Sequence, residues 1–218
     1  MVPDEWRHVL EREFPYFRKL EARQRDKLVA DVRTFAAKDF VGLDGFVVDD
    51  RVRVHVAATA ALLVVELNMT LFEHVRRVEM REARYFDDRG NLAEGHYEYG
   101  THEVTGPVGI LHLAWHGILD GAARRDGMHV GIHELAHALD HGLGERLLDQ
   151  HERCEVWRHS LRDMPLHNGL VIADVEGPEL FAVASELFFE RPMTLMRIDP
   201  ALFFELVDIY KIDTRTLQ

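Results

Sequence analysis

The chain has 218 residues, of which 47% are apolar and 29% charged, a balance that suits one folded domain with a charged surface. Its 38 acidic and 26 basic residues give a net charge of −12. A field of that sign repels phosphate backbones and anionic lipid surfaces. The composition therefore argues against direct binding to nucleic acid or to membranes.

Secretion and disulfide bonding are not expected for this sequence. The longest apolar run, residues 56–65, contains Thr59 and is far too short to cross a bilayer. The first residues lack the basic and then apolar regions of a signal peptide. Cys154 is the single cysteine, so it cannot form an intramolecular disulfide, which favours a reducing compartment. We expect a cytoplasmic protein.

Helices are predicted for most of the first third of the chain. Apolar residues spaced three or four apart predict amphipathic helices over residues 4–20 and 23–38. The segment 40–45 contains two glycines and is predicted as a turn-rich connection. Between residues 50 and 68 apolar side chains cover nearly every face, which indicates a helix buried at the centre of the core.

Strand signals follow, and helices then dominate to the end. Strands are predicted within residues 75–86 and 96–115, with turns at Gly90-Asn91 and Gly106-Pro107. Helices are predicted at about residues 127–140, 149–162, 178–190 and 200–211. We therefore expect a single domain, residues 1–218, of the α+β class. It is mostly helical, with a small sheet before the helix at 127–140, and residues 1–38 form a helical segment packed on it.

The main chemical motif is His133-Glu134-Leu135-Ala136-His137. Residues four apart on a helix share one face, so the two imidazoles can reach a single metal ion. Zinc accepts imidazole nitrogens, and a glutamate directly after the first ligand can take a proton from a zinc-bound water. The surrounding helix is apolar almost all round, and buried polar groups need partners. The alternative is a pair of core histidines bonded to carbonyl groups.

A third protein ligand is required, and several acidic residues are candidates. Glu179 lies in the first turn of a predicted helix, where the helix dipole favours an ionised carboxylate. Glu186, two turns further along, is the main competitor, and Asp140 follows His137 by one turn. Asp140 is better suited to support a ligating imidazole or to cap the helix. His129 and His141 flank the motif but are predicted to project elsewhere.

These residues resemble two signatures of a known family. The stretch from His133 to Asp140 is similar to the His-Glu-x-x-His-x-Leu-Asp helix of the Mlc titration factor A family of zinc-dependent peptidases. The helix from Pro178 to Phe189 is similar to that family's second signature, in which the leading glutamate is the third zinc ligand. Further similar segments are residues 40–45, 57–63 and 119–121.

The resemblance implies a cytoplasmic zinc metallopeptidase of the gluzincin type, with a zincin-like catalytic domain similar to that of anthrax lethal factor. It implies one Zn2+ ion held by His133, His137 and Glu179, with Glu134 as the catalytic base. Family members show aminopeptidase-like activity on small peptides. The founding member also binds the glucose repressor Mlc. The alternative function is therefore a regulatory protein that sequesters a transcription repressor of this type, with weak or no catalysis.

One position departs from the family pattern. The family tends to place a tyrosine, suited to stabilising an oxyanion, about seven residues before the third ligand, where this chain has Ile172. Tyr97, Tyr99 and His167 are the alternative donors that the sequence offers.

Overall fold

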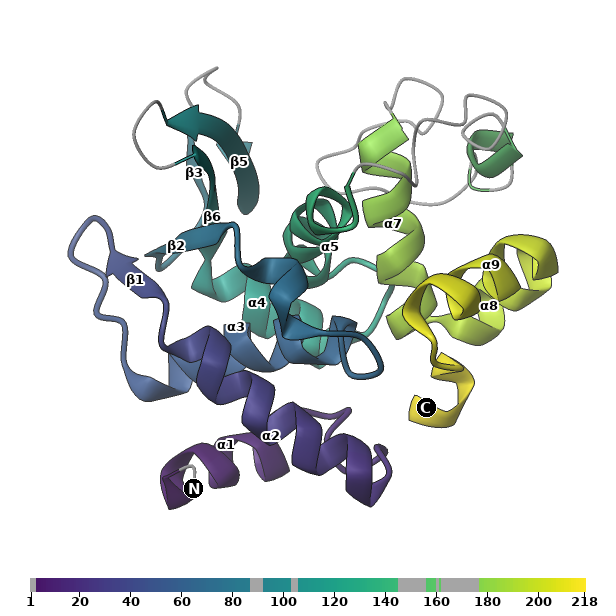
Figure 1. Ribbon diagram of the computed structural model, residues 1–218, viewed down its shortest axis with the longest axis horizontal. Helices are drawn as coiled ribbons and strands as arrows, with labels where there is room; N and C mark the ends of the chain where they lie inside the picture. The colour runs from purple at the N-terminus through teal and green to yellow at the C-terminus, as the bar shows by residue number, and fades with distance from the viewer. Residues whose placement is uncertain (1–2, 87–91, 103–105, 145–155, 160, 162–176) are drawn as a thin grey trace.

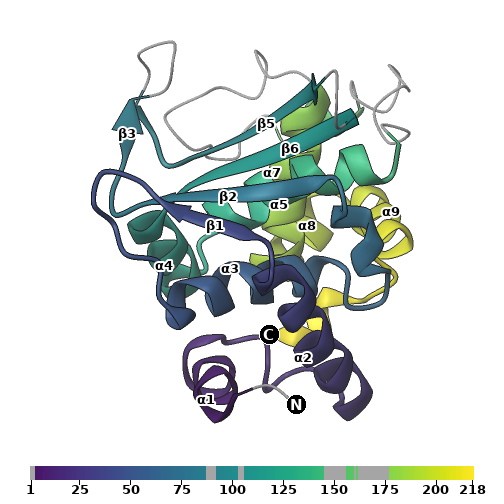
Figure 2. The same cartoon turned by 60° about the vertical axis from the view of Figure 1, so that its left-hand side comes forward.

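The computed structural model describes residues 3–86, 92–102, 106–144, 156–159, 161 and 177–218. A mixed four-stranded sheet packs on α5 (Val130–Gly142), and Figure 2 shows α5 behind the strands and α3 (Asp50–Leu63) below them. The strand order is β1 (Asp39–Gly42), β2 (Val75–Arg81), β6 (Gly106–Ala114) and β5 (Gly95–His102). The first two neighbouring pairs are parallel and the last is antiparallel, which leaves β5 at one edge of the described sheet.

The sheet presents one apolar face to the helices. Val78 of β2 is in register with Leu111 of β6, and both side chains are fully buried. Their neighbours Glu79 and His112 point to the opposite face, where the His112 ring lies 3.2 Å from the Glu79 carboxylate. This alternation is the period of two expected for a sheet that is covered on one side. A short hairpin, β3 (Tyr85–Phe86) and β4 (Leu92–Ala93), lies outside this sheet.

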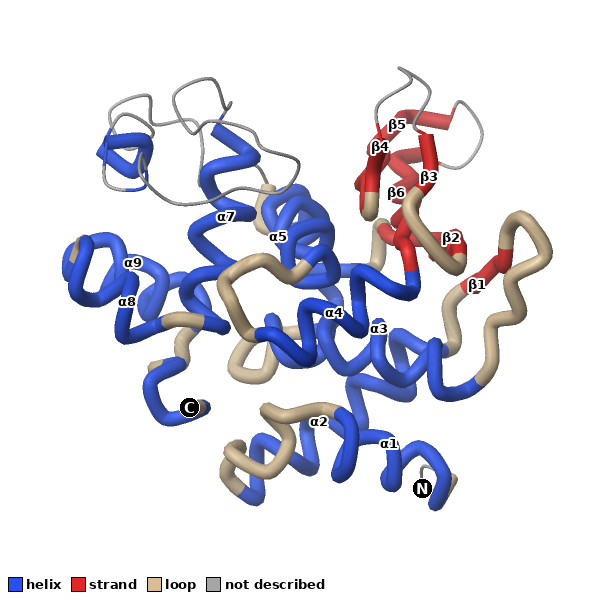
Figure 3. The backbone as a smooth tube through the Cα atoms, turned by 180° about the vertical axis from the view of Figure 1, so that it is seen from behind, coloured by secondary structure: helices blue, strands red, loops and turns tan. Residues whose placement is uncertain are grey.

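Helix α3 (Asp50–Leu63) occupies the centre of the core. Asp49 caps its first turn by accepting a hydrogen bond from the Val52 backbone N–H, and every residue from Val54 to Leu63 is buried. Helices α1 (Asp4–Glu13) and α2 (Ala22–Ala36) pack against it, as the view from behind shows (Figure 3). The sequence pattern predicted this burial, because no face of α3 is polar enough to meet solvent.

Helices α7, α8 and α9 lie on the side of α5 that is away from the sheet. Helix α7 lies beside α5, and α8 and α9 pack on α7 (Figure 1). A 3-10 turn, η1, precedes β2, and another, η4, follows α9. The bounds of the remaining helices and turns are α4 (Trp115–Arg124), α5 (Val130–Gly142), α7 (Gly177–Glu190), α8 (Pro192–Ile198), α9 (Pro200–Tyr210), η1 (Met69–Phe72) and η4 (Thr214–Leu217). No helix in the described part of the chain is long and apolar enough to cross a membrane.

The predicted α+β, mostly helical class is confirmed, with corrections to individual elements. The first helix ends at Glu13 rather than at residue 20, because Phe14 is extended before Pro15. The connection predicted at 40–45 overlaps β1, which pairs with β2. Gly106-Pro107 is not a turn but the start of β6, where Pro107 is opposite Thr101. A proline is tolerated near the beginning of a strand.

Two helices were not predicted, and one prediction lies mainly outside the described residues. Helix α4 begins where the predicted strand 96–115 ends, and α8 fills the space between two predicted helices. Of the helix predicted at 149–162, only residues 156–159 and 161 are described, and they are helical. The turn predicted at Gly90-Asn91 also lies outside the described residues.

Candidate metal centre

The two motif histidines lie on one face of α5. His129 caps the helix through its ring Nδ1, which accepts a hydrogen bond from the Ile132 backbone N–H at 3.4 Å. His133 and His137 follow one turn apart, and their ring centroids are separated by 4.9 Å. Most of α5 is buried, so these rings project from a packed helix that fixes their position. The i, i+4 spacing therefore places two imidazoles at one point, as the sequence predicted.

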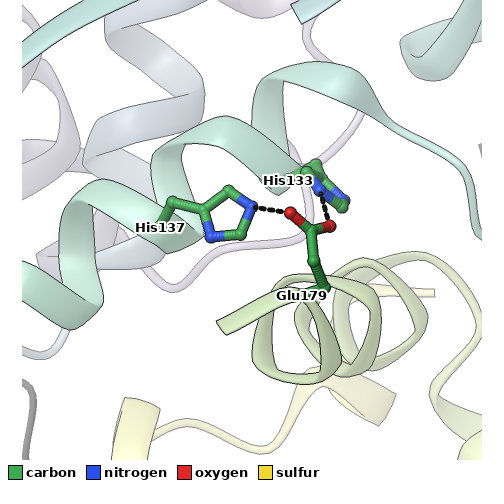
Figure 4. A group of neighbouring side chains, drawn as sticks. All are labelled: His133, His137 and Glu179. Carbon is green, nitrogen blue, oxygen red and sulfur yellow. Dashed lines mark hydrogen bonds and ion pairs between the residues drawn. The ribbon is translucent and has the colours of Figure 1, made fainter. Parts of the chain in front are cut away.

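Helix α7 brings Glu179 to the same point. Its carboxylate lies between the two rings, with Oε2 3.0 Å from His133 Nε2 and Oε1 3.2 Å from His137 Nε2 (Figure 4). One ligand atom from each of these three residues lies within 4.8 Å of the other two. Among the described residues, this is the one group of at least three such side chains with that geometry.

The three side chains polarise one another strongly. Burial alone would raise the pKa of Glu179, but hydrogen bonds from both imidazoles and their positive charge hold it well below its usual value. Burial likewise opposes the charged form of His133, yet the carboxylates of Glu186 and Glu179 raise its pKa well above the usual value. The group thus holds a carboxylate that stays ionised, as a metal ligand must be.

The donor set fits a metal ion of the zinc type. Two imidazole nitrogens and one carboxylate oxygen are the protein ligands of several catalytic zinc sites, in which a water takes the fourth position. His133 Nε2 and His137 Nε2 face the same carboxylate, so the three ligand atoms converge on one point. A divalent cation there would satisfy all three side chains at once.

Glu186 lies behind His133 instead of facing the same point. Its Oε1 is 2.7 Å from His133 Nδ1, and its other oxygen accepts a hydrogen bond from the backbone N–H of His129. The side chain is almost fully buried. Without a metal ion, Nδ1 donates to Glu186 and Nε2 donates to Glu179. If a metal ion replaced the Nε2 proton, the Nδ1 hydrogen bond to Glu186 would keep Nε2 as the nitrogen that binds it. Glu186, considered above as a third ligand, is therefore placed to support one.

Glu134 is buried on the side of α5 that faces β5. A Cβ atom at Gly95 of β5 would lie 2.9 Å from Glu134 Oε1 and 2.4 Å from a methyl group of Val130. The strand can come this close to the helix because Gly95 has no side chain. The sequence predicted Glu134 beside the metal ligands but gave no role to Gly95, which directly precedes the predicted strand at 96–115.

The other candidates have different positions. His141 packs against Tyr97, with 5.5 Å between the ring centroids. Asp140 is buried, and its negative charge adds to the effect of burial in raising the pKa of the Tyr210 hydroxyl. The Tyr97 hydroxyl lies against Gly109 of the neighbouring strand, since a Cβ there would be 2.5 Å from it. The Tyr99 side chain, His167 and Ile172 lie outside what the structure describes.

Comparison with known proteins agrees with this geometry. Residues 1–163 match the model of the family described as glucose-regulated metallo-peptidase M90. An uncharacterized protein of Synechocystis sp. is 29% identical, with 97% of this chain and 85% of the relative aligned. Mlc titration factor A of Yersinia pestis is 25% identical, covering 96% of this chain and 84% of the relative. The same protein of Yersinia pseudotuberculosis has the same identity and coverage.

The family match ends before α7, so Glu179 lies beyond it, whereas the alignments with the relatives extend over nearly the whole chain. The family and the group formed by His133, His137 and Glu179 both indicate a metallopeptidase fold with a metal site. The resemblance to the Mlc titration factor A family is confirmed, and the chain belongs to the glucose-regulated metallo-peptidase M90 family.

Proposed function

We propose that this protein is a zinc-dependent peptidase that hydrolyses small peptides. The observation that carries the proposal is the convergence of His133, His137 and Glu179 on one point, with Glu134 one residue after the first histidine. The aminopeptidase-like preference rests on the family resemblance alone. The lone Cys154 supports a reducing, cytoplasmic compartment.

Each side chain has a distinct chemical task in this proposal. His133, His137 and Glu179 would hold the zinc ion, which supplies a Lewis acid and a water of lowered pKa when bound. The Glu134 carboxylate takes a proton from the attacking water while the new carbon–oxygen bond forms. It then gives that proton to the amine as the carbon–nitrogen bond breaks. Glu186 keeps the His133 ring in one orientation and tautomer.

The position of β5 supports a peptide as the substrate. This strand is hydrogen-bonded on one side to β6 and is the last strand of the described sheet. Its first residue, Gly95, lies directly against Glu134. An extended peptide can add to the edge of a sheet through backbone hydrogen bonds. Such a peptide would lie along β5 with its backbone carbonyls near α5.

A second candidate function is favoured by the names of the relatives. Two of them are named Mlc titration factor A, which indicates that those proteins act on the regulator Mlc. The alternative for this chain is a protein that sequesters a transcription regulator of the Mlc type. In that case the metal group would stabilise the fold, since a ligand bound to the native state adds stability by mass action.

Metal analysis combined with peptide hydrolysis tests the proposal. Wild type, Glu134→Gln and the matched control Glu82→Gln, which changes an exposed glutamate, are each expected to carry one zinc ion per chain. Wild type and the control should hydrolyse short chromogenic peptides. Glu134→Gln should lose roughly 10²–10⁴-fold in rate, because the amide cannot take the proton.

The two functions give opposite results in this experiment. If wild type hydrolyses none of the peptides while wild type and Glu134→Gln retain a DNA-binding regulator equally from host lysate, the sequestering function replaces the enzyme. A protein that takes up no zinc during titration contradicts both the peptidase and its metal site. Hydrolysis that depends on Glu134, together with retention of the regulator, means that both functions coexist.

A further inference from the structure

The end of α7 is attached to the loop that leads into α5. Three side-chain hydrogen bonds join them, each to a backbone atom of the loop or of the residue that caps α5. Glu186 accepts a hydrogen bond from the N–H of His129, Glu190 accepts one from the N–H of Gly127 at 3.0 Å, and Arg191 donates to the carbonyl of Asp126 at 3.3 Å. Helix α7 also carries Glu179, and the loop continues directly into the helix with His133 and His137. These contacts therefore join the two helices of the metal group.

The loop can approach α7 this closely because position 127 is a glycine. Gly127 has a φ of +93°, which L side chains rarely adopt, and a Cβ there would lie 2.9 Å from a methyl group of Leu187. Arg125, two residues earlier, also has a positive φ, of 47°. Glycine adopts a positive φ without steric strain, whereas at Arg125 it costs free energy. Such a conformation persists only where surrounding contacts fix it, and the Glu190–Gly127 hydrogen bond is one of them.

Glu190 is buried in a polar cluster made from three segments. Its side chain is 3% exposed, and within the described part of the chain neither its Oε1 nor the Tyr16 hydroxyl has a hydrogen-bond partner of standard geometry. The Arg125 guanidinium lies 4.9 Å from the Tyr16 ring. The charged or titratable groups that face Glu190 are Tyr16 from the segment before α2, Arg125 and Asp126 from the loop, and Glu186 from α7 itself.

We propose that Glu190 is a positioning residue, which holds the Gly127 amide and thereby fixes the alignment of α5 and α7 that brings Glu179 to the two histidines. This role rests on the metal site proposed above. Glu190 touches none of the three ligands and acts through the loop backbone. Burial, with a smaller contribution from the nearby Glu186 carboxylate, raises the pKa of its carboxyl to about 7, so the side chain is a neutral acceptor in weakly acidic solution.

Three variants separate this role from a simple packing role. Glu190→Gln keeps the size and a neutral acceptor for the Gly127 amide, and Glu190→Ala removes the acceptor. Asp208→Asn, an exposed residue of α9, is the control. The first measurement is zinc affinity by competition with a chelator at pH 6. We expect Glu190→Ala to bind zinc about tenfold more weakly than wild type, which is the lower end of the range for residues that orient metal ligands. Glu190→Gln and the control should stay within about threefold of wild type.

The pH profile gives a readout that packing alone would not produce. The ratio of zinc affinities of wild type and Glu190→Gln cancels the titration of the ligands, which both proteins share. Below pH 7 this ratio should be constant. Above pH 7 wild type alone becomes ionised at this position. The carboxylate accepts from the Gly127 amide more strongly than an amide oxygen does, but Glu186 and Asp126 repel it, so the ratio should change several-fold. A ratio that is constant up to pH 8.5 overturns the assignment.

Hydrogen exchange of the Gly127 amide tests the contact without any metal. In the metal-free proteins the amide should be protected in wild type and Glu190→Gln, and it should exchange at least about tenfold faster in Glu190→Ala. Equal exchange in all three, or zinc affinity in Glu190→Ala equal to the control, overturns the positioning role. If wild type binds no zinc, the metal proposal fails, and Gly127 exchange alone then decides whether Glu190 holds the loop.

Discussion

Helices α3 and α5 are both apolar, buried helices that contain histidine, but their histidines have different surroundings. Both are buried almost all round, and both contain histidine among apolar residues. On α3, Thr59 donates to the carbonyl of His55 one turn earlier, and the His55 ring lies 3.2 Å from Glu13 of α1. On α5, His133 and His137 both face Glu179 of α7.

The difference lies in how many polar side chains converge. His55 meets a single carboxylate at the edge of the core and is also packed against the ring of Trp115. The α5 histidines share one carboxylate, and a second one, Glu186, lies behind His133. Burial of a polar group requires one partner, whereas a metal site requires several donors at one point. Helical burial alone therefore does not distinguish a core helix from one that carries a reactive group.

Among the variants considered, removal of the Glu179 carboxylate, which His133 and His137 share, should have the largest effect on zinc affinity. Glu179→Ala leaves two imidazoles on α5, and we expect zinc affinity to fall by several orders of magnitude, because one of three protein ligands is lost. Competition with a chelator of known affinity measures the loss. His55→Ala on α3 is the matched control and should bind zinc as wild type does. If Glu179→Ala retains wild-type affinity, Glu179 is not a ligand.

A core substitution on α3 should produce the opposite pattern. Leu62 is fully buried, so Leu62→Ala should lower the free energy of unfolding by about 2–5 kcal/mol through lost burial and the cavity left behind. Zinc stoichiometry of the folded protein should not change. Denaturant unfolding of the metal-free protein measures the first effect, and metal analysis the second. A loss of zinc at full stability would show that α3 also shapes the metal group.

The support behind His133 should give a smaller effect. In Glu186→Gln, the amide oxygen can still accept from the His129 N–H, but a neutral group then faces His133 Nδ1. Zinc affinity should fall about 10–100-fold, the range for residues that orient a ligand. The chelator competition described for Glu179→Ala measures it, with Glu82→Gln as the control. A loss as large as that of Glu179→Ala would make Glu186 a ligand.

The smallest expected effect is a pH dependence at the far end of α5. Burial, together with the nearby His141 and Lys38, lowers the pKa of His74 to about 4. The folded protein thus binds fewer protons than the unfolded chain between pH 6.5 and 4. Stability from this group is intact above about pH 6.5 and decreases as the pH falls toward 4, by about 1–2 kcal/mol after allowance for partial exposure.

His74→Gln should remove that part of the acid lability. Its free energy of unfolding should decline less than that of wild type between pH 6.5 and 4, and the two profiles should run parallel above pH 7. Parallel profiles over the whole range would show that the pKa of His74 is the same in the folded and the unfolded protein, and would contradict this prediction.

Local features of this fold could be read from the sequence, and long-range ones could not. Helices α3, α5 and α7 were predicted near their observed bounds, because apolar periodicity and capping residues act within a few positions. Strand β1 was missed, since its pairing with β2 joins Asp39 to Arg77, far apart in the chain. An isolated four-residue segment has no periodicity that would distinguish it from a turn.

The same division applies to the candidate site. The i, i+4 histidines are a local pattern on one helix, and Glu179 was favoured by its place in a first helical turn. The contact of Glu186 with His133 and the approach of Gly95 to Glu134 depend on how α5 crosses α7 and β5. Those crossings are set by packing of whole elements, so no spacing in the sequence indicates them.

The separation of the proposed metal ligands along the chain has a consequence for folding. His133 and Glu179 are 46 residues apart, and α7 is itself held by segments that follow it, since Thr214 donates to the carbonyl of Phe188. Helix α5 can form early from local contacts, but it then offers only two imidazoles. If these residues bind a metal ion as proposed, full affinity would arise only when α7 docks, a step that closes a long loop and is correspondingly slow. Metal uptake during refolding would therefore report completion of the tertiary structure rather than formation of the motif helix.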